Sequence, residues 1–547
     1  MRRTLFLFSS LFLLAASVPA GAQEDVYAPW RASWAQKAEE AKPALIEQIV
    51  RPVSLVRSVA DPAAFQGWSM HPSGPVSDYY GRSLKQQPEV TVDFGKHLTG
   101  YFTFRIRTLA RTQDAPIRLR FTFGEVPAEL NTPLDPWKGG LSRAWMQDEV
   151  ITVLEVDKDI TLERRLAGRY LKIELLGAPP DFDFAMDDLY FRAVTSAGES
   201  LSLPPAQAPE RIRKINDVAV ETLRECMQTV YEDGPKRDKR LWIGDLYLES
   251  LANNYSFRNH RLTKRCLYLL ASLAAEDGRL HANVFETPQP HPQYGSHTLD
   301  YSLIYNVALL EYVKATGDTE TARDLWPVVE NQIAWAKSFL TPERIVDPEL
   351  NGKVWLVFDW RAGFDATTSI QGLMIWALKA SYELAGLVGM QDRAKDYPGL
   401  AERMKAAARK YQWDKKRGIF VSGPDRQVSY LSQVWMILSG VLSQKEAQKA
   451  LNAVFADADA VYPGAPYAYH YLIEACVEAG LCDEAYERLV NYWGGMVDRG
   501  ADTYWEVYDP AKPELSPYDF FPVNSYCHAW SCTPVYFIGK YPEIFLR

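Results

Sequence analysis

Between residue 51 and the end of this 547-residue chain, the hydrophobic residues change their spacing at one point, near residue 200. Before that point apolar and polar residues alternate, as in "EVTVDFGKHLTGYFTFRIRTLA" and "RYLKIELLG", with Pro, Gly and Asp between the runs. This alternation is typical of strands with one buried face, because successive side chains of a strand point to opposite faces of its sheet. Residues 51–200 are therefore predicted to form an antiparallel β-sandwich.

Beyond the Pro-rich run "LSLPPAQAPE" the apolar spacing becomes that of an α-helix and stays so for the rest of the chain. The helical patterns come in consecutive pairs, and many end in Gly or Gly-Asp, which stops a helix. Paired helices without a fixed-length repeat favour an (α/α)6 barrel, a six-hairpin toroid, over a solenoid. We predict this barrel for residues 201–547, and hence a multidomain α and β protein.

The first 22 residues have the pattern of a secretory signal peptide. Two arginines precede an apolar run from Leu5 to Ala16, and the small residues Ala20-Gly21-Ala22 follow. The run is too short to span a membrane as a helix. We expect cleavage after Ala22, a periplasmic or secreted protein with no membrane span, and a helical segment over residues 23–50.

Composition narrows the classes of partner. The net charge of −9 argues against nucleic acid. The six cysteines form no CxxC pair and the histidines are dispersed, so neither a metal nor another cofactor is predicted. Aromatic residues make up 13% of the chain, which suits a carbohydrate cleft where flat rings stack on sugars. Large helical cores use aromatic residues as well, so this composition alone does not decide.

Three segments between the helical patterns place an acid beside a tryptophan, and a fourth adds His528 close to Trp530. They are "EDGPKRDKRLWIGDLYL" (232–248), "VFDWRAGFD" (357–365), "GADTYWEVYDP" (500–510) and "VNSYCHAWS" (523–531). A single acid beside a tryptophan is more often a helix cap next to a core aromatic residue. Three such pairs in three loops favour a functional site, because a toroid brings these loops to one mouth.

The first of these segments resembles a motif of the α-L-rhamnosidases of glycoside hydrolase family 78 and their six-hairpin relatives. The family motif reads Asp-Cys-Pro-Gln-Arg-Asp-Glu-Arg-Leu-Gly-Trp-Thr-Gly-Asp. The matching positions here are Asp233, Pro235, Arg237, Asp238, Arg240, Leu241, Trp242, Gly244 and Asp245. "VDFGKHLTGYF" also resembles the family's sandwich. The resemblance implies a β-sandwich ahead of an (α/α)6 barrel, and a glycoside hydrolase.

The resemblance also implies roles for individual residues. "TYWEVY" is similar to the family's second carboxylate motif and places Glu506 at the general-base position. Asp359-Trp360 resembles the family's Asp-Trp pair, and His528 lies about as far beyond Glu506 as the family's sugar-binding histidine lies beyond its base. The implied substrate-binding residues are Asp233, Arg237, Trp242, Asp245, Asp359, Trp360, Trp505 and His528. We expect Trp242, Trp360, Trp505 and His528 to face one cavity.

The chain departs from the family at the general acid. The family uses the Glu of its Arg-Asp-Glu-Arg run, whereas here the run is Arg237-Asp238-Lys239-Arg240 and the motif is one residue shorter. A lysine, with a reference pKa of about 10.4, holds its proton too tightly to protonate a leaving oxygen efficiently near neutral pH. We therefore favour Asp238 as the acid. Asp245, an acid elsewhere, or no hydrolytic acid at all are the alternatives.

These observations predict an exo-acting, inverting glycoside hydrolase that releases terminal α-L-rhamnose, or a similar deoxy-sugar, from a glycan or glycoside. Inversion needs one carboxyl group as acid and another as base, about 6.5–9.5 Å apart. One alternative is a lyase that cleaves a rhamnosyl-uronate linkage, for which Lys239 and Arg240 would neutralise the uronate. Another is a catalytically impaired relative that binds carbohydrate without turnover.

Overall fold

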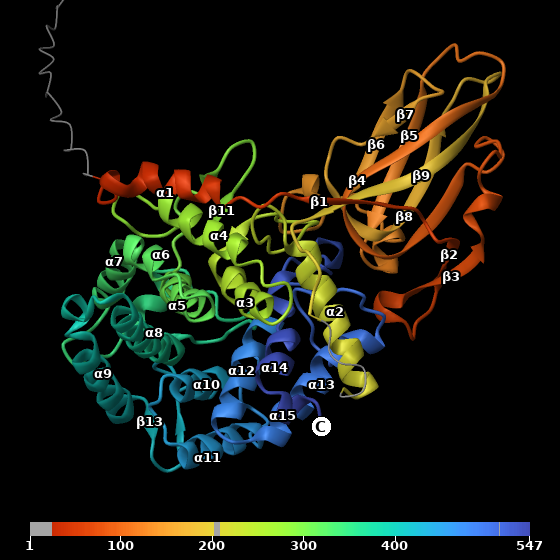
Figure 1. Ribbon diagram of the computed structural model, residues 1–547. Coiled ribbons are helices and arrows are strands. Elements are labelled where there is room, and N and C mark those ends of the chain that lie inside the picture. Colours follow the sequence, from red (N-terminus) through yellow and green to blue (C-terminus); the bar gives the residue numbers. More distant parts are fainter. Residues whose placement is uncertain (1–24, 202–207, 513–514) are drawn as a thin grey trace, which may run out of the picture.

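The computed structural model describes residues 25–201, 208–512 and 515–547, which form a β-sheet domain followed by a helical domain (Figure 1). The strands stand to one side, and the helices form a ring. Helix α2 (Glu210–Cys226) packs against strands of the sandwich and joins the two parts. The predicted fold class, an antiparallel sandwich ahead of a six-hairpin barrel, is confirmed. The predicted signal peptide, residues 1–22, and most of the Pro-rich linker lie outside the described residues.

The sandwich is organised by one long strand, β4 (Glu89–Ala110). Its first half pairs with β8 (Leu166–Gly177) and its second half with β9 (Asp183–Thr195). The other strands are β1 (Ile46–Val50), β2 (Ser54–Ala60), β3 (Trp68–Gly74), β5 (Ile117–Gly124), β6 (Asp148–Val153) and β7 (Asp159–Thr161). Phe102, Phe104 and Ile106 of β4 are all buried, since alternate residues face the core.

The segment 23–50, predicted to be helical, is helical only in its first part. Helix α1 (Ala28–Glu40) packs against α4 (His260–Ser272) of the barrel. Strand β1 follows and pairs in antiparallel register with β9, so the sheet begins before residue 51. The β-branched and apolar residues of β1 were too few to show a period of two.

Six helical hairpins form the barrel. The outer helices are α2, α4, α7 (Trp326–Lys337), α9 (Tyr397–Tyr411), α11 (Gln444–Phe455) and α13 (Cys482–Asp498). The inner helices are α3 (Ile243–Asn254), α5 (Leu299–Thr316), α8 (Thr367–Val388), α10 (Tyr430–Leu438), α12 (Pro466–Glu478) and α14 (Pro534–Lys540). Helices α3, α5, α8, α10 and α12 contact one another in this order, and α14 packs against α3.

Short elements complete the chain. They are α6 (Thr319–Asp324), α15 (Pro542–Phe545) and the strands β10 (Leu241–Trp242), β11 (Asn283–Phe285), β12 (His291–Pro292), β13 (Trp413–Asp414) and β14 (Ile419–Phe420). Strand β10 pairs with β11 directly before α3 begins, and this pairing fixes the position of Trp242. Within the described residues, no helix combines the length and the apolar content that crossing a membrane requires.

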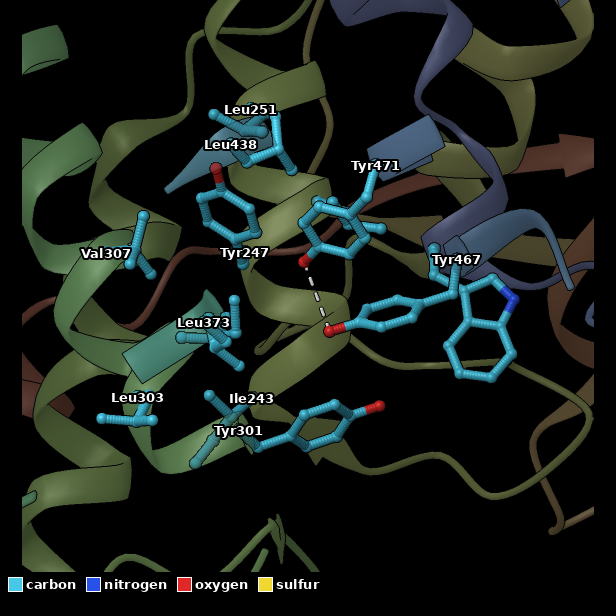
Figure 2. Close-up of a cluster of buried hydrophobic side chains, with 14 of the residues drawn as sticks. Ile243, Tyr247, Leu251, Tyr301, Leu303, Val307, Leu373, Leu438, Tyr467 and Tyr471 are labelled. Atoms are coloured by element: carbon cyan, nitrogen blue, oxygen red, sulfur yellow. Dashed lines mark hydrogen bonds between the residues drawn. The ribbon is translucent and has the colours of Figure 1, made fainter. Parts of the chain in front are cut away.

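The inner helices α3 and α10 are buried on nearly all sides, whereas an outer helix such as α11 is buried along one face. Almost every residue of α3 and α10 is buried, but α11 buries only a stripe. Figure 2 shows the side chains that fill the space between the inner helices, among them Tyr247, Tyr301 and Tyr471. The hydroxyl of Tyr471 donates to that of Tyr467 at 3.3 Å. Because this level of the barrel is packed, a ligand cavity has to lie at the rim.

Candidate active site

A cavity of about 230 Å³ lies at the rim where the inner helices begin. Asp245 and Tyr301, in the first turns of α3 and α5, form part of its floor. Its full lining is Leu141, Asp233, Arg237, Asp238, Arg240, Trp242, Asp245, Gln293, Tyr301, Trp355, Val357, Trp360, Glu506, Tyr518, His528 and Trp530. The structure thus brings together residues from all four of the tryptophan-containing segments.

Asp233 organises the segment that carries Arg237 and Asp238. Its two carboxylate oxygens accept the backbone N–H groups of Asp238 at 3.2 Å and of Arg240 at 3.0 Å. Aspartate often closes a loop in this way, because its short side chain reaches nearby backbone donors. Burial, with the neighbouring Asp238 carboxylate, raises the pKa of Asp233 to about 8. A carboxyl group at the cavity wall is therefore protonated at neutral pH.

Glu506 is buried and held by three donors. The guanidinium group of Arg237 and the backbone N–H of Ser525, at 3.1 Å, both donate to one carboxylate oxygen. The hydroxyl of Tyr518 donates to the other oxygen at 2.5 Å. Three donors from three segments fix the orientation of this carboxylate.

Arg237 also connects Glu506 to Asp238. Its Nη1 lies 3.3 Å from one oxygen of Asp238, and Nη1 of Arg240 lies 3.6 Å from the other. The guanidinium group stacks 4.4 Å above the ring of Tyr518, a cation–π contact that adds to its rigidity. The guanidinium group of Arg237 thus contacts the carboxylates of both Glu506 and Asp238. The distance between these carboxylates depends on the size of the guanidinium group and on the two contacts.

Asp245 and His528 form a second polar pair. Oδ1 of Asp245 lies 3.3 Å from Nε2 of His528, and both residues are buried. Burial raises the pKa of the Asp245 carboxyl group. Burial alone would lower the pKa of His528, but the carboxylates of Asp245 and Glu506 outweigh it and raise the pKa. The pair can present either a donor or an acceptor to a ligand hydroxyl group.

Aromatic rings form the remaining walls. The ring of Trp242 meets those of Trp355 and Tyr301 edge to face, with centroids 5.9 and 6.3 Å apart. Trp360 lies 5.9 Å from the ring of Tyr518, and its buried indole N–H has no hydrogen-bond partner among the described residues. Apolar, aromatic walls with a few free polar groups are typical of sites that bind small molecules.

Two family models match the chain. The model of the glycosyl hydrolase family 78 alpha-rhamnosidase N-terminal domain matches residues 52–193. The model of the bacterial alpha-L-rhamnosidase 6 hairpin glycosidase domain matches residues 208–541, which is more than half of the chain. The chain belongs to the bacterial α-L-rhamnosidases of glycoside hydrolase family 78. It is therefore a glycoside hydrolase.

One solved structure agrees with this assignment, and two further proteins are more distantly similar. The structure is similar to a rhamnosidase from Klebsiella oxytoca with rhamnose bound, with 38% identity and a TM-score of 0.90 over 93% of this chain and 99% of that one. It shares its fold with the family 78 rhamnosidase of Bacillus sp. GL1, with 21% identity and a TM-score of 0.69 over 83% of this chain and 46% of that one. A curated N,N'-diacetylchitobiose phosphorylase from Vibrio furnissii is 25% identical over 185 residues, which is 30% of this chain and only 22% of that protein.

Two of the residues that the α-L-rhamnosidase resemblance placed in the cavity lie outside its lining. Trp505 stacks on Phe65 of the sandwich domain, with ring centroids 4.0 Å apart, because the chain turns Glu506 toward the cavity and its neighbour away. Asp359 accepts the backbone N–H groups of Gly464 at 2.7 Å and Trp360 at 2.9 Å. Burial raises the pKa of Asp359 to about 7, and its role is to hold the loop that carries Trp360.

Lys239 also points away from the cavity. Its backbone has a positive φ of 59°, and its Nζ donates to the backbone carbonyl of Arg165 in the sandwich at 2.6 Å. Burial and the charge of Arg165 lower the pKa of Lys239 to about 7. The residue that occupies the position of the family's glutamate is therefore part of the domain interface.

Some residues that line the cavity were not predicted from the sequence. Trp530 stands two residues after His528 and could have been included with it. Tyr518 and Leu141 lie outside the four segments considered, although "DPWKGGLSRAW" around Leu141 also combines charged residues with tryptophan and could have been included. Leu141 belongs to the loop between β5 and β6, so the sandwich contributes directly to the cavity of this rhamnosidase-family enzyme.

Proposed function

We propose that this enzyme is an exo-acting, inverting hydrolase that releases terminal α-L-rhamnose, or a similar deoxy-sugar, from a glycan or glycoside. The observation that carries the proposal is the pair of cavity carboxylates, Glu506 and Asp238, joined by one guanidinium group. The packed barrel core beneath the cavity favours a chain end over the middle of a polymer. The solved relative with 38% identity is a rhamnosidase with rhamnose bound.

Glu506 is the proposed base. Three donors hold its carboxylate in one orientation, so it can take the proton of a water molecule that attacks the sugar. Inversion requires this carboxylate and the acid to be about 6.5–9.5 Å apart, with room for the water between them. The bridge through Arg237 is compatible with this spacing, because two contacts and a guanidinium group lie between the two carboxylates.

Asp238 is the proposed acid, with Asp233 as its partner. Both oxygens of Asp233 are bonded to the backbone of the loop, whereas the carboxyl group of Asp238 lines the cavity beside side chains alone. Since burial and the nearby Asp238 raise the pKa of Asp233 to about 8, Asp233 holds a proton at neutral pH. In the proposed step Asp238 receives this proton from Asp233 and delivers it to the leaving oxygen.

The charges of the cavity favour a neutral glycoside over a uronate. Its cations, Arg237 and Arg240, face the carboxylates of Asp233, Asp238, Asp245 and Glu506. Lys239, which a lyase would use to neutralise a uronate, lies at the domain interface instead. These contacts support hydrolysis over the eliminative alternative.

The test is product analysis. The purified protein is incubated with p-nitrophenyl α-L-rhamnoside and with rhamnose-bearing glycosides, and the first anomer released is followed by NMR. We expect rhamnose in the β configuration. Release of the α anomer first would contradict inversion, an unsaturated uronate would support the lyase, and binding of rhamnose with no turnover would support the impaired relative.

We also propose that the protein is exported. The support is the pattern of residues 1–22, with two arginines, a short apolar run and small residues at its end. Mass spectrometry of the protein from its natural compartment should show a chain that begins at Gln23. Retention of residues 1–22 in that protein would contradict the proposal.

A further inference from the structure

Each of the three donors to Glu506 is close in sequence to a group that is hydrogen-bonded to the β-sandwich. Arg237 directly follows Lys236, whose side chain enters the sandwich. Ser525 directly precedes Tyr526, whose backbone N–H is bonded to the sandwich. The third donor, Tyr518, has its own carbonyl bonded to a loop of the sandwich. We call the three donors to Glu506, namely Arg237, Tyr518 and Ser525, the cradle of the proposed base. This cradle is attached to the β-sandwich at three points.

Lys236 forms the first attachment. Its Nζ donates to Glu129 at 2.6 Å and lies 3.1 Å from Glu125, and all three residues are buried. The same ammonium group donates to the carbonyl of Asn524 at 2.5 Å, directly before Ser525. Burial opposes charge here, but the ammonium group of Lys236 lowers the pKa of Glu125 to about 2, so the pair is ionised.

Glu125 forms the second attachment. One of its oxygens accepts the backbone N–H of Tyr526 at 2.7 Å, and the other lies 3.1 Å from Nε2 of His97. The opposite nitrogen of His97 lies 3.4 Å from Glu225 of α2, so the sandwich carboxylate is itself braced. A single carboxylate therefore touches the neighbours of both Arg237 and Ser525.

The loop between β5 and β6 forms the third attachment. The backbone N–H of Gly140 donates to the carbonyl of Tyr518 at 3.0 Å. Two residues along, the ring of Phe520 meets that of Trp137 edge to face at 5.6 Å. These contacts hold the segment from which the Tyr518 hydroxyl reaches Glu506.

We propose that the β-sandwich is a working part of the active site and that Glu125 and Lys236 are positioning residues for Glu506. The inference rests on the proposed function, since it needs Glu506 to act as the base. In a buried interface an ion pair with additional backbone bonds is rigid, and its loss leaves one charge unpaired. A shift of about 1 Å in a catalytic group can cost about 10²-fold in rate.

A matched control exists in the same interface. Arg165 of the sandwich forms a bidentate pair with Glu232, at 2.6 and 2.7 Å, and both side chains are largely buried. Neither residue bonds to Glu506 or to any of its three donors among the described residues. Removing this pair weakens the contact between the domains without loosening the cradle.

The experiment compares Lys236→Met and Glu125→Gln with Arg165→Met. For each variant, kcat and KM on an aryl rhamnoside, the Kd of rhamnose by calorimetry and the Tm are measured. We expect the first two variants to lower kcat by about 10- to 10²-fold while Kd changes by less than about 3-fold. Arg165→Met should lose a similar amount of Tm and keep its kcat.

The inference is overturned if Lys236→Met and Glu125→Gln lose no more kcat than Arg165→Met, or if rhamnose affinity falls as much as kcat. If Lys236→Met does not fold, Glu125→Gln decides, because it keeps the size of the side chain. The variant Glu506→Gln distinguishes a failure of the proposed function from a failure of this inference. A fully active Glu506→Gln refutes the proposed function itself, whereas an inactive Glu506→Gln beside an unaffected Glu125→Gln refutes the inference alone.

Discussion

Arg237 donates to Glu506 from within the same short loop that carries Asp238. A guanidinium group is planar and presents several donors in fixed directions, so it sets both the distance and the relative orientation of its two partners. The side chain of Arg237 therefore determines how the proposed acid, Asp238, and the proposed base, Glu506, lie relative to each other. Five predictions concern this pair and the cavity that it lines.

Replacement of the proposed base should slow turnover on every substrate. Glu506→Gln keeps the size of the side chain but cannot accept the proton of water, so kcat should fall by about 10²–10⁴-fold on aryl rhamnosides and disaccharides alike. The Kd of rhamnose, measured by calorimetry, should change little. A loss confined to disaccharides would show that Glu506 acts on the leaving group instead.

Replacement of the proposed acid should discriminate between leaving groups. Asp238→Asn should lower kcat by about 10²–10⁴-fold on a rhamnosyl disaccharide and much less on an activated aryl rhamnoside, whose phenolate leaves with little help from a proton. Steady-state kinetics on the two substrates measure the contrast. Equal losses on both would indicate that Asp238 holds the sugar.

A second substitution checks this assignment. Lys239→Glu restores the family's residue type, but the Lys239 side chain extends to the carbonyl of Arg165 and not into the cavity. The double variant Asp238→Asn, Lys239→Glu should therefore remain as slow on the disaccharide as Asp238→Asn. Recovery of activity would move the acid to position 239.

The stability of the protein should depend on pH because of the raised pKa of Asp233. Its folded pKa of about 8 lies above the ordinary aspartate value of 3.8, so the folded state binds an extra proton between these pH values. The stability that Asp233 contributes is complete below pH 4 and is lost as the pH rises through 8. In Asp233→Asn this loss is absent, so the Tm of the variant relative to the wild type should increase from pH 4 to pH 8. A constant difference would contradict the raised pKa.

Trp355 should contribute more to binding of the leaving group than to binding of rhamnose. Its ring is 46% exposed and lines both the site cavity and a neighbouring cavity of about 460 Å³. A stacked ring contributes about 0.5–1.5 kcal/mol, so Trp355→Ala should raise KM for a disaccharide roughly 2- to 10-fold. Tyr382→Ala, an exposed position on α8 outside both cavities, is the control. An unchanged KM in Trp355→Ala would exclude this contact.

The sequence could predict the parts of the site that local chemistry determines. The alternation in β4 and the paired helical patterns indicate both domains, and the motif from Asp233 to Asp245 identifies one wall of the cavity. It could not distinguish Trp505 from Glu506, because tertiary packing decides which of two neighbouring side chains in a loop faces the cavity. Tyr518 and Leu141 join the site only when the sandwich docks on the barrel, which no local pattern records.

Leu141 has a consequence for how such an enzyme can acquire new substrates. The loop between Gly124 and Asp148 closes one side of the cavity, yet the carboxylates of the barrel belong to other segments. Insertions or deletions in surface loops cost little free energy of folding. A change of loop length near Leu141 can therefore reshape the entrance for a different glycoside, but it also moves Gly140, whose backbone N–H is bonded to the carbonyl of Tyr518, so a new entrance comes together with a change in the support of the proposed base.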